Sequence, residues 1–279
     1  MGDVLRVASA QAEAVPGDLA ANTATAARLA VRAAAEGVRL LVLPELFLPA
    51  YHPPTLAADA STDVAADEAG TVADPRLDPL RSAASAHGIV IVVGAAVRRP
   101  EGRRTLSCLV VDRSGAARAA YDKQHLWGPD EKALFSPGEA GATLTLDGWR
   151  LALGICYDGC FPEHGRAAAG AGADAYLCPA AYLDGSQHRR DLYYAARALD
   201  NTMYVVFSNV VGGPAGWRFN GGAAVYDPEG RPLVRAPDTG EDMVTADLAR
   251  AGLTRVRARH TMLADRRPLP PARHEIVVA

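Results

Sequence analysis

The chain has 279 residues, of which 49% are hydrophobic and 22% are charged. This composition supplies enough apolar material for a sizeable core and is unlike that of a disordered chain. The formal net charge is -3, and the 29 basic and 32 acidic residues are spread along the sequence. The chain therefore offers no concentrated positive surface for nucleic acid or an anionic membrane, and we expect a globular protein whose partner is a small, roughly neutral molecule.

The N-terminal segment MGDVLRVASAQ lacks the basic and apolar regions of a signal peptide. The longest strongly apolar stretch, residues 89–97, is far shorter than the ~20 residues of a membrane-spanning helix. We therefore expect a cytoplasmic protein. In that compartment free thiols are the expected state of the four cysteines, which are Cys108, Cys156, Cys160 and Cys178.

The first half of the chain is expected to fold as a β-α-β unit followed by a hairpin region. Apolar periodicity predicts an alanine-rich helix that opens near Asn22, and Ser114-Gly115 predicts a hairpin turn. A loop is expected over residues 51–71, and a second alanine-rich helix follows it. The predicted strands span residues 5–11, 39–44, 89–97, 106–112 and 117–123.

The second half repeats the alternation of strands and helices. Pro162 can occupy the first turn of a helix, and a further helix is expected over residues 187–200. The predicted strands span residues 142–146, 150–156, 173–180, 203–210, 223–226 and 243–247. The two halves therefore predict similar β-α-β arrangements.

No linker separates the halves, so we expect residues 1–279 to form a single α/β domain. Its expected architecture is a two-sheet α-β-β-α sandwich with internal pseudo-symmetry, in which helices cover the outer faces. The stretch 255–279 is rich in Arg and Pro and lacks apolar periodicity. It predicts a C-terminal arm that lies on a neighbouring subunit.

Three buried strands run into reactive side chains. The segment RLLVLP leads to Glu45, ARAAYD leads to Lys123, and RLALGI leads to Cys156. Active sites of α/β proteins collect where strands end. A carboxylate, an ammonium and a thiol are poor choices at these positions unless they meet and compensate one another. We therefore expect a nucleophilic site that contains all three.

Each of the three residue types has a task in acyl transfer from nitrogen. A thiol with an ordinary pKa of about 8.5 is mostly protonated at neutral pH, so it needs a base or a cation nearby. An ammonium and a backbone N–H after the nucleophile would stabilise the charge that develops on the carbonyl oxygen. A carboxylic acid would then return a proton to the departing amine.

The same segments resemble the motifs of the nitrilase superfamily of carbon–nitrogen hydrolases, over nearly the full length of the chain. LPELFLPAY is similar to the glutamate motif, AYDKQHL to the lysine motif and GICYDGCFPE to the cysteine motif. The resemblance implies that Glu45 is the general base and acid, Lys123 the oxyanion stabiliser and Cys156 the nucleophile. GPDEKALFSPGE resembles the segment with the supporting glutamate, which implies that role for Glu131.

Later segments, RALDNTMYVVFSNVVG, FNGGAAVYDPEG and DRRPL, also resemble the family. The chain departs from the family at Ala223, where a serine often follows the paired glycines, and at Leu106, where an asparagine is frequent. Members commonly pair through their C-terminal segments, so the resemblance implies a homodimer or larger homo-oligomer. No cofactor is expected, because the glycine-rich runs match no nucleotide-binding fingerprint.

Other readings of the cysteine segment are possible. Cys160 is expected to be a small apolar filler near the helix start. Cys156, Cys160 and His164 are four apart, but they give three ligands at spacings unlike those of zinc sites, so no metal is expected. Asp158 is interpreted as scaffold that favours the helix dipole, and Glu163 is expected to pair with Arg166.

The substrate is expected to be a small linear amide or carbamoyl compound, cleaved through a thioester. Tyr51, Trp127, Tyr157 and Tyr182 are the candidate substrate-binding residues, although Trp127 could equally pack its loop, as could His125. Nitrile-cleaving members often have Trp and Glu after the nucleophile, whereas Tyr157 and Asp158 follow here. The alternatives are therefore a nitrilase, an N-carbamoyl amidohydrolase, or a catalytically silent scaffold or ammonia-channel partner that keeps the fold.

Overall fold

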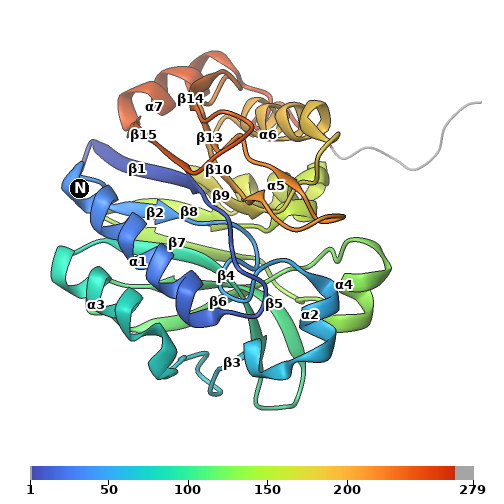
Figure 1. Cartoon of the computed structure of the whole chain (residues 1–279). Coiled ribbons are helices and arrows are strands. Elements are labelled where there is room, and N and C mark those ends of the chain that lie inside the picture. Colours follow the sequence, from blue (N-terminus) through green and yellow to red (C-terminus); the bar gives the residue numbers. More distant parts are fainter. Residues whose placement is uncertain (1, 268–279) are drawn as a thin grey trace, which may run out of the picture.

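Two β-sheets pack face to face, and helices cover both outer faces (Figure 1). The structure is a computed structural model that describes residues 2–267. The first sheet has the order β15-β1-β2-β4-β5-β6, with β3 beside β4. Its strands are β1 (Val4–Gln11), β2 (Leu40–Val42), β3 (Val64–Ala65), β4 (Val90–Arg98), β5 (Arg104–Val111), β6 (Ala117–Asp122) and β15 (Asp242–Ala249).

The second sheet has the order β14-β13-β10-β9-β8-β7. Its strands are β7 (Ala142–Leu146), β8 (Trp149–Leu153), β9 (Ala175–Ala180), β10 (Tyr204–Asn209), β13 (Ala224–Tyr226) and β14 (Pro232–Arg235). A small ribbon pairs β11 (Val211–Gly212) with β12 (Phe219–Asn220). The helices are α1 (Leu19–Ala35), α2 (Pro53–Ala58), α3 (Asp78–His87), α4 (Gly128–Leu134), α5 (Pro162–Gly170), α6 (Gln187–Asn201) and α7 (Arg250–Arg259).

The two sheets have similar centres, which confirms the predicted two-sheet architecture with internal pseudo-symmetry. In the first, β1, β2 and β4 are parallel and alternate along the chain with α1 and α3. In the second, β8, β9 and β10 are parallel and alternate with α5 and α6. Each centre is a βαβαβ unit, and the carboxyl ends of its strands are the places where loops can carry reactive groups.

The strands bury both faces, as strands between helices and a second sheet must. Leu41 faces α1 and α3, whereas its neighbours Leu40 and Val42 belong to the cluster between the sheets. Leu177 lies in that central cluster, and the residue before it faces α5 and α6. Successive side chains point to opposite faces of a strand, and both faces are buried here. The sequence of each central strand is therefore a near-continuous apolar run.

Direct hydrogen bonds join the two sheets at β1 and β10. The Ser208 hydroxyl donates to the Ala10 carbonyl at 2.6 Å, and the Ser9 hydroxyl donates to the Phe207 carbonyl at 2.5 Å. Both of these buried hydroxyls thus have an acceptor, which removes the cost of leaving them unpaired. These hydrogen bonds fix the two sheets relative to each other. They therefore also fix the relative positions of the loops that leave each sheet.

Some predicted boundaries are wrong. Helix α1 begins at Leu19 rather than near Asn22, because the Asp18 carboxylate caps it by accepting from the Ala21 N–H at 2.9 Å. The expected loop 51–71 contains α2 and β3. The strand predicted to reach residue 156 ends at Leu153.

The expectation that residues from 255 on add nothing to the core is also wrong for residues 255–259. They belong to α7, whose Leu253 and Val256 are buried. These two residues lie three apart and form one helical face, which is too short to give a periodic signal. The last part of the expected arm, residues 268–279, lies outside the described residues.

Candidate active site

The loops after β2, β6 and β8 bring Glu45, Lys123 and Cys156 together between the two sheets. Lys123 directly follows β6, and its side chain is fully buried. Its ammonium donates to Glu45 Oε1 at 2.6 Å, and the Glu45 carboxylate is also fully buried. Cys156 is partly exposed to a cavity and lies close enough for its thiol and the other two groups to shift one another's pKa.

The Glu45 loop is shaped by close contact with Gly94 of β4. The Gly94 N–H donates to the Pro44 carbonyl at 3.0 Å, and the Gly94 carbonyl accepts from Leu48 at 3.1 Å. A Cβ on Gly94 would lie 2.2 Å from the backbone nitrogen of Leu46. Leu46 itself has a φ of 47°, a conformation that costs a leucine free energy. The loop is therefore held in an unfavourable shape that turns Glu45 into the interior.

The turn that carries Cys156 is strained in the same way. Cys156 has a φ of 44° and is the first residue of a short 3₁₀ helix, Cys156–Cys160. Its carbonyl accepts from the Tyr194 hydroxyl of α6 at 2.9 Å. Residues held in the left-handed region are frequent at active sites, where surrounding contacts compensate the strain. Here the strain exposes the thiol to the cavity at the point where the chain leaves the sheet.

Asp158 holds this turn and the lysine loop together. Its carboxylate accepts from the backbone N–H of Ile155 at 3.0 Å and from that of His125 at 2.9 Å. The His125 ring and the Tyr121 hydroxyl contact the same carboxylate at 2.8 and 2.7 Å. Burial raises the pKa of Asp158, but the hydrogen bonds from His125 and Tyr121, together with electrostatic attraction from His164 and Lys123, lower the pKa overall.

Asp158 therefore has a structural role, as the scaffold interpretation expected, but the buried carboxylate acts by linking two loops of the site as well as by its place at a helix N-terminus. Its spacing of two from Cys156 is the signal that could have indicated this role. The predicted pair of Glu163 and Arg166 is wrong, because the described part of the chain contains no ion pair between them.

Glu131, from the first turn of α4, is the second carboxylate at Lys123. Both of its oxygens accept from the Lys123 ammonium at 2.8 Å. Oε1 also accepts from the Tyr51 hydroxyl at 2.6 Å, and Oε2 accepts from the Trp127 backbone N–H at 2.7 Å. The ammonium is thus fixed by two buried carboxylates, and Glu131 in turn is fixed by two further donors.

These contacts set the protonation of the site. Burial raises the pKa of Glu45 to about 7; the Lys123 ammonium opposes this, and the negative charge of Glu131 adds to it. Burial lowers the pKa of Lys123, but the two carboxylates more than reverse this and hold it well above its ordinary value. The site therefore keeps a charged ammonium beside a carboxyl group that exchanges protons near neutral pH.

The side chain of Cys156 is expected to rest as a protonated thiol. Burial raises the pKa of Cys156 well above its ordinary value, the Glu45 carboxylate raises it further, and the Lys123 ammonium lowers it. Attack by sulfur therefore requires a base. Glu45 is suited to that task because its Oε1 holds Lys123 while Oε2 has no hydrogen-bond partner among residues 2–267.

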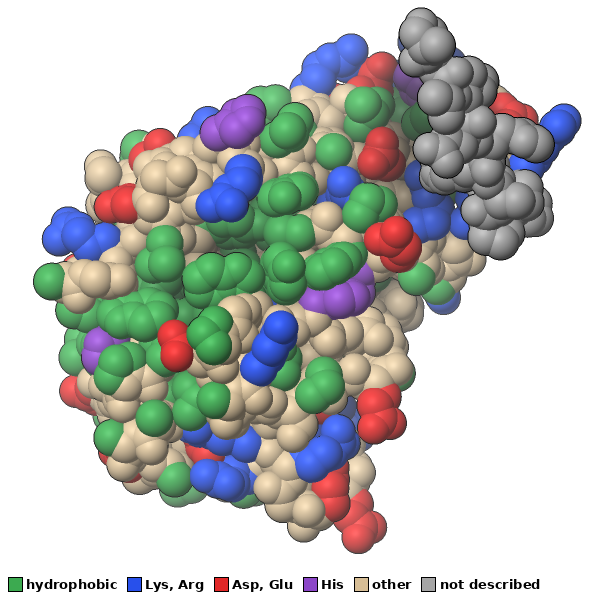
Figure 2. All heavy atoms as spheres, turned by 90° about the vertical axis from the view of Figure 1, so that its right-hand side faces the viewer, with side chains coloured by type: hydrophobic (Ala, Val, Ile, Leu, Met, Phe, Trp, Pro, Cys, Tyr) green, Lys and Arg blue, Asp and Glu red, His purple; other side chains and the backbone are tan. Residues whose placement is uncertain are grey.

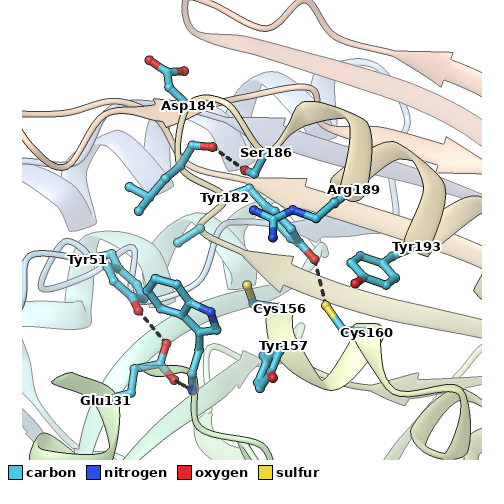
Figure 3. A pocket seen from close by; sticks show the side chains of 13 residues that line it. Tyr51, Glu131, Cys156, Tyr157, Cys160, Tyr182, Asp184, Ser186, Arg189 and Tyr193 are labelled. Carbon is cyan, nitrogen blue, oxygen red and sulfur yellow. Dashed lines mark hydrogen bonds between the residues drawn. The ribbon is translucent and has the colours of Figure 1, made fainter. Parts of the chain in front are cut away.

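A cavity of about 290 Å³ opens beside the thiol, close to the lower end of the range for small-molecule sites. Hydrophobic side chains gather on the face of the molecule that carries α2 and α4 (Figure 2). All four candidate substrate-binding residues line the cavity: Tyr51, Trp127, Tyr157 and Tyr182. Figure 3 labels three of them, Tyr51, Tyr157 and Tyr182, around Cys156. Other lining residues, which were not candidates for substrate binding, include Asp184, Ser186, Arg189 and Tyr193.

The other residues considered in the sequence, Cys160, His164 and His125, contact aromatic side chains. Cys160 lines the cavity, and its sulfur lies 3.2 Å from the Tyr182 hydroxyl. The two ring nitrogens of His164 contact the hydroxyls of Tyr121 and Tyr176, both at 2.9 Å. Within residues 2–267, no group of three or more Cys, His, Asp or Glu side chains is arranged to hold a metal ion. The His125 ring stacks on Phe161 at 4.0 Å between centroids.

Leu106 and Ala223, the two positions that depart from the nitrilase-superfamily pattern, still form hydrogen bonds that hold neighbouring segments in place. Leu106 is buried between the sheets, and its carbonyl accepts from the Lys123 backbone N–H at 2.8 Å. The Ala223 N–H donates to Gln11 Oε1 at 2.9 Å. At both positions a backbone group holds a neighbouring segment, and the Leu106 side chain also packs in the core.

Comparison with known proteins identifies the family. Residues 6–258 match the sequence profile described as carbon-nitrogen hydrolase, and the chain belongs to this family. It is 32% identical to an (R)-stereoselective amidase of a Pseudomonas species, over 89% of this chain and 90% of that protein.

The structure also resembles that of an amidase from Nesterenkonia sp. AN1. A double mutant of that amidase in complex with acrylamide matches with a TM-score of 0.81 and 33% identity, over 95% of each chain. Another mutant, which carries the acetamide moiety of fluoroacetamide on its active-site cysteine, matches with a TM-score of 0.80 and 33% identity, over 94% of each chain. The fold and the reaction class expected from the sequence motifs agree with these relatives.

Proposed function

We propose that the protein is an amidase that hydrolyses a small linear amide through a thioester on Cys156. The observation that carries this proposal is the buried network of Glu45, Lys123 and Glu131 beside a thiol that faces a small cavity. A buried charged network of this kind costs free energy unless its groups compensate one another, and it is typical of functional sites. The amidase relatives support the same reaction.

In the first half of the proposed reaction, the Glu45 carboxylate accepts the proton of the Cys156 thiol. The sulfur attacks the amide carbonyl carbon, and the negative charge on its oxygen is stabilised by the Lys123 ammonium and the backbone N–H of Tyr157. When the tetrahedral intermediate collapses, the C–N bond breaks and Glu45 returns its proton to the leaving amine. The products of this half-reaction are a thioester and ammonia or an amine.

In the second half, Glu45 accepts a proton from a water molecule that attacks the thioester. The carbon–sulfur bond then breaks, the carboxylic acid leaves, and the proton returns to the Cys156 sulfur. A pKa of about 7 for Glu45 suits both tasks, because a group that titrates near the working pH can accept and return a proton. Glu131 acts by positioning Lys123 and, through Tyr51, one wall of the cavity.

Two neighbouring activities use the same machinery. A nitrile or an N-carbamoyl amine could also form an acyl adduct on the sulfur. The residues after the nucleophile, Tyr157 and Asp158, favour the amide, since Asp158 is committed to structural hydrogen bonds with Ile155 and His125. A silent scaffold would have no need for the strained Cys156 turn.

The test is ammonia release from a panel of linear amides, nitriles and N-carbamoyl amino acids, with Cys156→Ala as the matched inactive variant. We expect turnover of amides that depends on Cys156 and exceeds turnover of the corresponding nitriles. Preferred cleavage of nitriles, or ammonia release that persists in Cys156→Ala, would contradict the proposal.

A cytoplasmic location and assembly as a homodimer or larger homo-oligomer are part of the same proposal. The cysteines Cys108, Cys156, Cys160 and Cys178 are free, as expected in a reducing compartment. Within residues 2–267, no helix is long and apolar enough to cross a membrane. Sedimentation at micromolar concentration tests the assembly, and a monomer would contradict it.

A further inference from the structure

Arg189 is the one basic residue that lines the cavity, and its charge is uncompensated among residues 2–267. It lies in the first turn of α6, is exposed, and forms no ion pair with any of those residues. Its neighbour Arg190 differs in every respect: it is buried and pairs with Asp191 at 2.8 Å and with Asp238 at 3.0 Å. The two adjacent arginines therefore have different tasks, and only the second has a structural one.

The acidic residues of the cavity do not neutralise Arg189. Glu131 is committed to the Lys123 ammonium and to two further donors. Asp184 lines the cavity, but Figure 3 shows its carboxylate directed away from Cys156, whereas the Arg189 side chain extends over the space in front of the thiol. Arg189 is therefore the cation at the cavity mouth that can meet an anionic group of an entering molecule.

The charge of Arg189 also reaches the cavity floor. Burial raises the pKa of the Cys160 thiol, and the Arg189 guanidinium is among the groups that lower it. The cavity walls are largely aromatic, since Tyr51, Trp127, Tyr157, Tyr182 and Tyr193 are among the lining residues. A ligand that fits this arrangement has a reacting carbonyl at one end, a short apolar middle and an anion at the other end.

We propose that Arg189 binds a carboxylate of the substrate, so that the preferred substrate is a short linear amide with a carboxylate at the end remote from the amide. This inference rests on the proposed amidase function and adds the substrate class. A guanidinium binds a carboxylate with two parallel hydrogen bonds, which fixes the orientation of the chain between them. The contact lies away from the reacting atoms, so it contributes to binding and raises KM when lost.

The first experiment compares monoamides of dicarboxylic acids with two to four methylene groups against neutral amides of the same length. We expect the unmodified enzyme to prefer the carboxylate series in kcat/KM. Arg189→Gln reduces the ratio of the two kcat/KM values by about tenfold, mainly through KM, which is the typical effect of losing a charge-assisted hydrogen bond. Arg189→Lys restores part of the ratio.

The matched control is Arg118→Gln, which removes the same charge from an exposed position of β6 outside this cavity. It should leave the ratio unchanged. A preference for neutral amides, a preference for amides that carry an ammonium group, or a ratio that Arg189→Gln does not alter would overturn the inference while leaving the amidase function in place.

A second readout does not depend on turnover. The rate of Cys156 alkylation is measured with N-iodoacetyl-β-alanine and with its neutral methyl ester, and the modified residue is identified by peptide mass spectrometry. We expect the acid to react faster than the ester, and Arg189→Gln to remove this difference. Equal rates in the unmodified protein would overturn the inference, whereas a difference that Arg189 controls would support it even if no amide in the panel were hydrolysed.

Discussion

Glu131→Gln is the substitution that most specifically tests how the buried charges work together. It keeps the size of the side chain and removes one of the two negative charges around Lys123. In the structure both Glu131 oxygens accept from that ammonium at 2.8 Å, and each accepts one more hydrogen bond, from Tyr51 or from the Trp127 N–H. A glutamine can offer only one oxygen to these donors.

The amide oxygen of the glutamine must face the Trp127 N–H, because a backbone N–H cannot become an acceptor. The amide nitrogen then faces the Tyr51 hydroxyl, which loses its acceptor, and Lys123 loses one of two bonds to this residue. Hydrogen bonds to charged groups contribute about 1.5–3 kcal/mol, and breaking a buried ion pair costs about 3–5 kcal/mol. We therefore expect the free energy of unfolding to fall by about 3 kcal/mol, with a decrease in Tm of about 6–12 °C.

The pH dependence of activity gives an independent signature. Glu45 must be ionised to accept the thiol proton, so kcat/KM should fall as the pH decreases through the pKa of Glu45, which is about 7. The negative charge of Glu131 raises that pKa, so its removal should move the acid limb to lower pH. A displaced Lys123 should also reduce kcat, by up to about 100-fold.

The assay combines thermal unfolding with a pH profile of ammonia release for the unmodified enzyme and Glu131→Gln. Glu139→Gln serves as the control, because the Glu139 side chain is 89% exposed and should change neither quantity. An acid limb that stays in place, or moves to higher pH, would refute the assigned electrostatic coupling. A Glu131→Gln variant with unchanged Tm would refute the stability argument.

Three further predictions concern other parts of the site. Lys123→Ala should raise the activation free energy of acylation by at least ~2.7–4 kcal/mol, which is the typical contribution of one oxyanion donor. A decrease of less than tenfold in the single-turnover rate of acylation would contradict the role of Lys123. Cys160→Ala should retain a substantial part of kcat, because its sulfur contacts Tyr182 rather than the charged network; activity as low as that of Cys156→Ala would reverse the assignment of the nucleophile. Asp158→Asn should lower kcat by about 10- to 100-fold and slow alkylation of Cys156, because it loosens the nucleophile turn; unchanged alkylation and kcat would show that the carboxylate does not position the thiol.

The sequence predicted site residues where a polar or reactive side chain follows a buried strand. Glu45, Lys123 and Cys156 could be singled out because polar groups at such positions need one another, and the structure brings all three together. The two-sheet fold could be predicted from two similar runs of alternating strands and helices. These patterns lie within short segments of the chain, so they can be recognised without knowing how the segments pack.

Other features depend on contacts that no local pattern reveals. Arg189 and Arg190 are adjacent and chemically identical, yet one lines the cavity and the other is buried against Asp238. The network of Asp158 joins segments that lie more than thirty residues apart. Helix α7 was missed because its buried face consists of two residues. In each case the deciding information is which loops the sheets bring together.

The central claim is that Cys156 carries an acyl group that Glu45 helps to release. Intact-mass spectrometry of Glu45→Gln after reaction with an activated ester tests it most directly, with peptide mapping to locate the adduct. We expect an acyl adduct on Cys156 that persists in Glu45→Gln and clears rapidly from the unmodified enzyme, because the glutamine cannot activate the attacking water. An adduct on Cys160, or one that clears from both proteins at the same rate, would contradict the account.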